Sequence, residues 1–126
     1  MLHDITSRYD IEVLMNRFYQ KALTDEVIGF YFTEVVQLNM QKHLPIIVDF
    51  WENILLNAHY YGRDPMQAHQ QLHQKHPFEA AHFDRWIALF TDTVSASFVG
   101  PKAEIAKQRA YSIGTVMKMK FIYHHE

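Results

Sequence analysis

The chain has 126 residues, no cysteine, a hydrophobic fraction of 48% and a formal net charge of -2. These values predict a single domain over residues 1–126 and exclude disulfides, thiolate catalysis and thiolate metal ligation. Because the chain has no broad basic field and no apolar run long enough to span a bilayer, we expect a cytoplasmic protein without nucleic-acid or membrane partners.

The first segment has the periodicity of an amphipathic helix. Apolar side chains recur on one helical face over residues 11–22, and Thr6 or Ser7 can cap the start of this helix. The pattern breaks at Gly29, and the aromatic residues Phe30–Phe32 follow directly. We expect a short helical turn there.

A second helix is expected over about residues 41–57, with a proline near its start. Pro45 lacks a backbone N–H and would clash with the turn before it, so the regular helix is predicted to begin near Pro45. His43 would then lie at a bend or in the entry turn.

Prolines also mark the helices of the second half. Asp64-Pro65 predicts the start of a short helix that runs toward His76, Pro77 ends it, and Gly100-Pro101 separates two longer helices. The result is an all-α chain of five or six helices without strands. The apolar stripes of the two long helices are Phe83, Trp86, Ile87, Phe90, Val94 and Phe98, then Ile105, Ala106, Ala110, Ile113, Met117 and Phe121.

The histidines of the short helix are candidate metal ligands. A haem iron needs a neutral imidazole with apolar and aromatic walls around the ring, and His69 lies one turn after Pro65. His73 shares its helix face and competes for this role. His69, His73 and His76 also form a row that can hold zinc, or that is simply solvated.

Three further residues are candidates for the other side of such a site. Tyr19 and Trp86 lie on apolar helix faces, and a buried phenol or indole needs a hydrogen-bond partner, which an iron-bound ligand would supply. His43 is a third candidate contact. Core packing accounts equally well for the two aromatic residues, and surface exposure for the histidine.

In their order, these residues resemble the truncated haemoglobins of group III. The likeness covers most of the chain. It is carried by Phe18-Tyr19, Ile28-Gly29-Phe30-Tyr31-Phe32, His43-Leu44-Pro45, Asp49-Phe50-Trp51-Glu52, Asp64-Pro65-Met66 with His69 behind, His82-Phe83-Asp84-Arg85-Trp86, and Leu89-Phe90.

The resemblance implies a shortened globin, a two-over-two helical sandwich around one b-type haem. It implies His69 as the proximal iron ligand, with His73 as the alternative, and Tyr19, His43 and Trp86 as contacts of the distal ligand. The interval of 26 positions from His43 to His69 agrees with this group and favours His69. Residues implied to line the haem are Phe32, Ile47, Phe50, Trp51, Phe83 and Trp86.

The function implied is reversible binding of a diatomic gas, oxygen or else nitric oxide or carbon monoxide. Donors at Tyr19 and Trp86 would slow its release, and a reductase would return the iron to the ferrous state for nitric oxide or peroxide detoxification. We expect a monomer or weak dimer, with Arg63 and Arg85 as candidate propionate partners.

Two other hypotheses belong to different classes. One is a helical zinc or non-haem metal protein that uses the row of His69, His73 and His76, with His82 as a further ligand. The other is a helical interaction module without a cofactor. Both leave the joint occurrence of Tyr19, His43 and Trp86 unexplained.

Overall fold

The computed structural model describes residues 1–35, 37, 39–60 and 65–123, and within these ranges all regular secondary structure is helical. The all-α prediction is therefore confirmed, and the helical turn expected after Gly29 is a π-helix. In chain order the elements are α1 (Arg8–Ala22), η1 (Tyr31–Val35), α2 (Met40–Leu55), α3 (Pro65–Lys75), α4 (Ala80–Ser97) and α5 (Pro101–Phe121).

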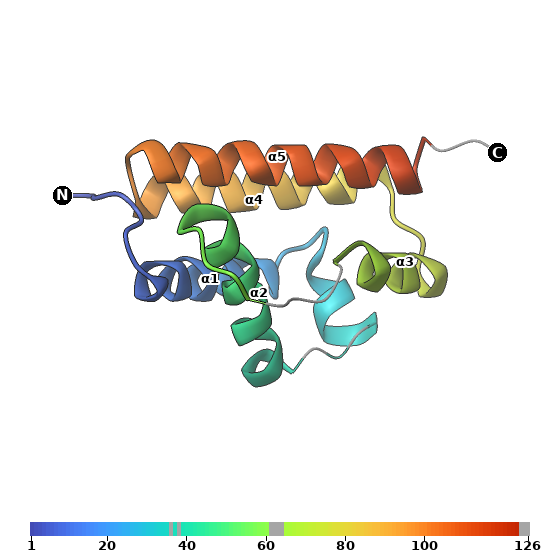
Figure 1. Ribbon diagram of the computed structural model, residues 1–126. Coiled ribbons are helices and arrows are strands. Elements are labelled where there is room, and N and C mark those ends of the chain that lie inside the picture. The colour runs from blue at the N-terminus through green and yellow to red at the C-terminus, as the bar shows by residue number, and fades with distance from the viewer. Residues whose placement is uncertain (36, 38, 61–64, 124–126) are drawn as a thin grey trace.

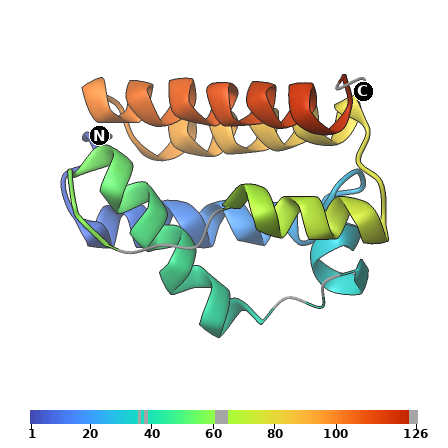
Figure 2. The same cartoon turned by 45° about the vertical axis from the view of Figure 1, so that its right-hand side comes forward.

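The helices form two layers. The long helices α4 and α5 pack side by side in one layer, and α1 lies in the other, crossed by α2 (Figure 1). Contacts of α1 with α4 and of α2 with α5 join the layers, while α3 packs chiefly against α5. The second view shows the same two layers, with α3 at the level of α1 (Figure 2). No helix in the described part of the chain has the length and apolar character needed to cross a membrane.

Side-chain caps fix the helix starts. Ser7, one of the two predicted caps, accepts a hydrogen bond from the backbone N–H of Asp10 at the start of α1. Glu79 and His82 form a reciprocal capping box at the start of α4. These local bonds satisfy backbone donors that have no partner inside the helix.

The start of α2 differs from the prediction. The helix begins at Met40, so Pro45 lies inside it, because the Asn39 side chain accepts hydrogen bonds from the N–H groups of Gln41 and Lys42. Both Pro45 and Gln41 are exposed, so water can reach the backbone carbonyl that the proline leaves unbonded. His43 consequently lies within the first turns of a regular helix.

The start of α5 is capped from far away in the chain. Asp4 accepts hydrogen bonds from the N–H groups of Lys102 (3.0 Å) and Ala103 (2.9 Å). Gly100 precedes the helix with φ at 143°, and a β-carbon there would lie 2.5 Å from the Asp4 carboxyl carbon. This junction therefore requires glycine.

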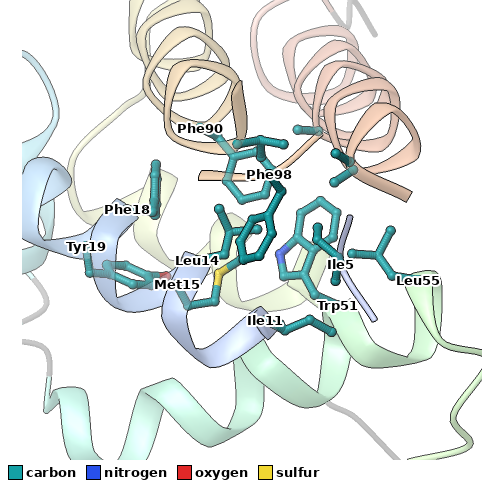
Figure 3. Packing of buried hydrophobic residues seen from close by; sticks show 14 of the residues in the cluster. Ile5, Ile11, Leu14, Met15, Phe18, Tyr19, Trp51, Leu55, Phe90 and Phe98 are labelled. Carbon is teal, nitrogen blue, oxygen red and sulfur yellow. The ribbon is translucent and has the colours of Figure 1, made fainter. Parts of the chain in front are cut away.

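The core lies between the layers and centres on stacked aromatic rings. Trp51 of α2 stacks on Phe90 of α4 with ring centroids 4.8 Å apart, and Phe18 of α1 meets the edge of Phe90 (Figure 3). The apolar face predicted for the first helix is buried as expected. Ile105 was wrongly assigned to the buried stripe of the last helix: it is exposed, and Ala103 turns inward instead.

Candidate functional site

Tyr19 and His43 meet at the edge of the core. Tyr19 Oη and His43 Nε2 are hydrogen-bonded at 2.8 Å, with the rings edge to face. The two residues come from α1 and α2, which are also tied together by Arg8 of α1 through its ion pairs with Asp49 and Glu52. Figure 3 shows Tyr19 at the margin of the packed cluster.

Burial keeps both polar groups uncharged. Desolvation raises the pKa of Tyr19 above its ordinary value, so the phenol stays protonated. The pKa of His43 is lowered, first by burial and then by the nearby His69 imidazole. His43 of α2 and His69 of α3 are therefore electrostatic neighbours, and His43 is neutral near pH 7.

Beside His43, α2 has a half-covered apolar face next to its buried one. Val48, Trp51 and Leu55 are buried in the core. On the adjoining face, Ile47 and Phe50 continue the line of His43 at helical spacing and keep part of their surface exposed. Leaving such side chains half-covered is unfavourable in water, so this face is suited to a flat apolar group.

Phe32 and Trp86 lie around the same site. The Phe32 ring contacts Tyr19 at 5.7 Å, and Trp86 contacts Phe18 at 6.4 Å and Phe90 at 5.7 Å. Both side chains are only partly buried.

Two of the predicted lining residues lie deeper. Trp51 is 1% exposed and stacked beneath Phe90, so it supports the half-covered face of α2 from within the core. Phe83 belongs to a second cluster with Phe78 and Phe121, at the end of the molecule where α3 packs. It is separated from His69 by the ring of Phe78, which His69 contacts at 6.3 Å.

The other histidines of the predicted row make different contacts. His73 stacks on Phe78, and its Nδ1 accepts the Phe78 backbone N–H at 2.9 Å. His76 and His82 point their Nδ1 atoms at the hydroxyl of Tyr31. Among the residues that the structure describes, no group of three histidine or carboxylate side chains can hold a metal ion, so the zinc hypothesis gains no support.

The expected propionate partners differ in their surroundings. Arg85 donates two hydrogen bonds to Asp25, of 2.9 Å and 2.7 Å, so its guanidinium is already paired with a carboxylate. This pair lowers the pKa of Asp25 despite the opposing effect of burial. Arg63 and Asp64 lie outside the described residues.

No family model matches the chain, but its fold is similar to that of a known protein. A solved structure, the crystal structure of a group III truncated hemoglobin from Campylobacter jejuni, superposes with a TM-score of 0.86, full coverage of both chains and 24% sequence identity. The chain has the fold of a truncated globin.

The sequence comparison agrees with the truncated globin fold. A curated protein from Campylobacter jejuni, "Group 3 truncated hemoglobin ctb", is 25% identical over 118 residues that cover 91% of each chain. The predicted resemblance to group III truncated haemoglobins is thereby confirmed. The two-over-two sandwich corresponds to the α4–α5 layer over the α1–α2 layer of this fold.

The residues at this site also have the chemistry that a haem requires. The imidazole of His43, which is neutral near pH 7, lies near that of His69 on α3, and the half-covered apolar side chains of Ile47 and Phe50 follow His43 along α2. A haem needs one imidazole for its iron, apolar walls for its ring and polar groups on the ligand side. The set of residues fits that group.

One residue important to this region was not singled out from the sequence. Tyr31 was assigned only to an aromatic cluster, yet its hydroxyl contacts Pro77, His82 and His76. These partners are 45 to 51 positions away along the chain, so no local pattern could reveal them.

Proposed function

We propose that this truncated globin binds a haem b between α2 and α3 and takes a diatomic gas on its iron. The observation that carries the proposal is that His43 and His69 are electrostatic neighbours beside a half-covered apolar face of α2, in a truncated globin fold. Because the chain has no cysteine, the haem would be held without thioether bonds.

His69 is the residue we propose as the axial ligand. It lies on the α3 side of the site opposite His43, and it is half-buried. His73 is less suitable because its Nδ1 already accepts a backbone hydrogen bond and its ring stacks on Phe78. Because Nδ1 of His73 accepts this bond, the proton of the neutral ring is on Nε2, which then has no lone pair to bind a metal.

Tyr19, His43 and Trp86 are proposed to surround the bound gas. A bound haem would supply the ferrous iron on which oxygen, nitric oxide or carbon monoxide is held. Tyr19 stays protonated and keeps an O–H donor in an apolar setting, where a hydrogen bond is stronger than in water. The indole N–H of Trp86 adds a second donor, so release of a polar ligand such as oxygen is slowed.

A protein that releases oxygen slowly is better suited to a reaction of the bound gas than to oxygen transport. We propose a role in oxygen chemistry or in nitric oxide or peroxide detoxification, with an external reductase that keeps the iron ferrous. The support for this is the number of polar groups around one small apolar site, since a carrier needs weaker retention. One globin domain over residues 1–126, acting as a monomer or weak dimer, completes the proposal.

The test is the optical spectrum of haem-loaded full-length protein, reduced and then exposed to carbon monoxide. The wild type should give a strong Soret band that shifts on carbon monoxide. His69→Ala should lose or alter this spectrum, and added imidazole should restore it by replacing the missing ligand.

His73→Asn is the matched control for that test. The Asn side-chain oxygen can replace the Nδ1 acceptor for the Phe78 N–H, so α3 should keep its end intact. A normal spectrum in this control assigns the axial ligand to His69. The opposite pattern would move the ligand to His73, and a colourless wild type under haem-replete conditions would refute the haem proposal.

A further inference from the structure

Tyr31 is a buried residue that the proposed function leaves unused. It is the first residue of η1, and only 3% of its surface is exposed. Its ring lies between Phe30, with centroids 4.2 Å apart, and Phe78, with centroids 4.9 Å apart. Packing alone would be served equally well by phenylalanine, so the hydroxyl needs its own explanation.

The hydroxyl binds the segment that joins α3 to α4. Tyr31 Oη donates to the Pro77 carbonyl at 3.0 Å and lies 3.2 Å from His82 Nδ1 and 3.4 Å from His76 Nδ1. Burial, and then the charge of Glu79, raise the pKa of Tyr31 to about 12. The phenol therefore remains a hydrogen-bond donor throughout the physiological pH range.

The segment that joins α3 to α4 is tied to the end of α3. The helix itself packs against α5. At its C-terminal end, His73 Nδ1 accepts the Phe78 N–H, which ties the last turn of α3 to the segment that Tyr31 contacts. The Phe78 ring contacts both Tyr31 and His69, at 4.9 Å and 6.3 Å.

We propose that Tyr31 is a positioning residue for His69. Its hydroxyl fixes the segment between α3 and α4, and the Phe78 ring of this segment contacts the imidazole of His69 and so holds it in place. The inference rests on the proposed function, since it assumes that His69 binds the haem iron. Tyr31 itself touches neither the haem nor the gas in this account. It sets where α3 places its imidazole.

The experiment compares haem-loaded wild type with Tyr31→Phe. Phenylalanine keeps the ring between Phe30 and Phe78 and removes only the hydroxyl. The iron–histidine stretching band of the ferrous protein, measured by resonance Raman spectroscopy, should shift or broaden. Because one hydrogen bond contributes roughly 1 kcal/mol, transfer of haem to excess apomyoglobin should be about fivefold faster.

Hydrogen exchange gives a readout that does not depend on activity. Amides of α3 should exchange faster in Tyr31→Phe, whereas those of α5, and of α4 beyond its first turn, should not change. Tyr111→Phe is the control, since Tyr111 of α5 is 62% exposed and lies outside this cluster. It should leave all three measurements at wild-type values.

The results separate the two proposals. A normal Soret band with an unmoved iron–histidine band in Tyr31→Phe overturns the positioning role and leaves the haem proposal standing. An equal rise of exchange in all helices also overturns the positioning role, because Tyr31 then serves only global stability. A wild type without a Soret band refutes the haem proposal itself, and the role of Tyr31 with it.

Discussion

At the scale of single residues, the site depends on keeping polar groups neutral inside an apolar setting. Tyr19 and His43 form a close hydrogen bond, and burial shifts the pKa of each group toward its uncharged form. The neutral O–H group of Tyr19 can reorient toward a bound ligand without placing a charge in an apolar environment, which would cost free energy. The hydroxyl of Tyr19 and the imidazole of His43 can each be tested by substitution.

Tyr19→Phe should speed oxygen release. The variant keeps the ring that meets Phe18 and Phe32 but removes the O–H donor. A hydrogen bond to a partly charged acceptor contributes roughly 1.5 to 3 kcal/mol, so the dissociation rate should rise at least about tenfold. Stopped-flow displacement of oxygen by carbon monoxide measures the rate.

The control for this prediction lies on the same helix. Tyr9 is 70% exposed, and Tyr9→Phe should leave oxygen dissociation unchanged. An unchanged rate in Tyr19→Phe as well would show that this hydroxyl does not contact the ligand.

His43 should make the fold acid-sensitive. Its pKa is below the unfolded value of 6.5, because burial and then His69 disfavour the charged form. The unfolded chain therefore binds more protons, and stability falls as the pH drops below 6.5 toward the folded pKa. His43→Leu should weaken this loss between about pH 7.5 and 5.5, measured by urea unfolding.

The slope of stability against pH, rather than its value, is the readout in that experiment. Leucine leaves the Tyr19 hydroxyl without its partner, which costs stability at every pH. The exposed residue His59 provides the comparison, since His59→Leu should keep the wild-type slope. Equal slopes in all three proteins would show that His43 does not cause the loss of stability at low pH.

At the scale of elements, the junction between α4 and α5 is the most constrained position described. Gly100→Ala should lower the free energy of unfolding by roughly 1 to 3 kcal/mol, since alanine is strained at positive φ. The new methyl group would also press on the Asp4 carboxylate. Urea denaturation measures the loss, with the neighbouring exposed residue in Val99→Ala as control.

A urea midpoint for Gly100→Ala equal to that of the control would show that the junction relaxes without cost.

The cap that Asp4 forms at the start of α5 is also electrostatic. Burial opposes ionisation of Asp4, but the N–H groups of Lys102, Ala103 and Ile5 hold its pKa below the usual value. The glycine and the aspartate therefore act at one site.

The helices themselves were largely predictable because their signals are local. The apolar face of α1, the cap at Ser7 and the breaks at Pro65 and Gly100-Pro101 follow from nearest neighbours along the chain. The early start of α2 was missed because the Asn39 cap outweighs the proline within it. Ile105 was misplaced since periodicity does not say which of two adjacent faces is covered.

The candidate site was predictable only through the resemblance. Tyr19, His43 and Trp86 lie on separate helices, and spacing along the chain does not state that Tyr19 meets His43. The choice between His69 and His73 likewise depends on long-range contacts, because both occupy one helix face. Tyr31 was missed for the same reason.

At the scale of the whole molecule, stability is unevenly distributed. The α4–α5 pair and its contacts with α1 make the main core, whereas α3 packs against α5 and the face of α2 that carries Ile47 and Phe50 is half-covered. A haem bound between α2 and α3 would cover this face. Its binding free energy would then add directly to the stability of the weakly packed part.

Removal of haem should therefore loosen α3 first. In the apoprotein, amides of α3 should exchange fastest among the helices, while those of α4 and α5 stay protected. Hydrogen exchange with mass spectrometry, before and after haem is added back, measures the difference. Uniform protection with and without haem would show that α3 needs no cofactor to stay in place.

The cap of α5 has a consequence for how the chain reaches its final form. Asp4 and Lys102, its hydrogen-bond partner, are 98 positions apart in a chain of 126 residues, so this contact closes a very long loop. Closing so long a loop costs entropy that is offset only when the intervening helices are already compact. During synthesis, Asp4 emerges before Lys102, so the cap cannot form until Lys102 has been made. The first turn of α5 is accordingly expected to form among the last steps of folding.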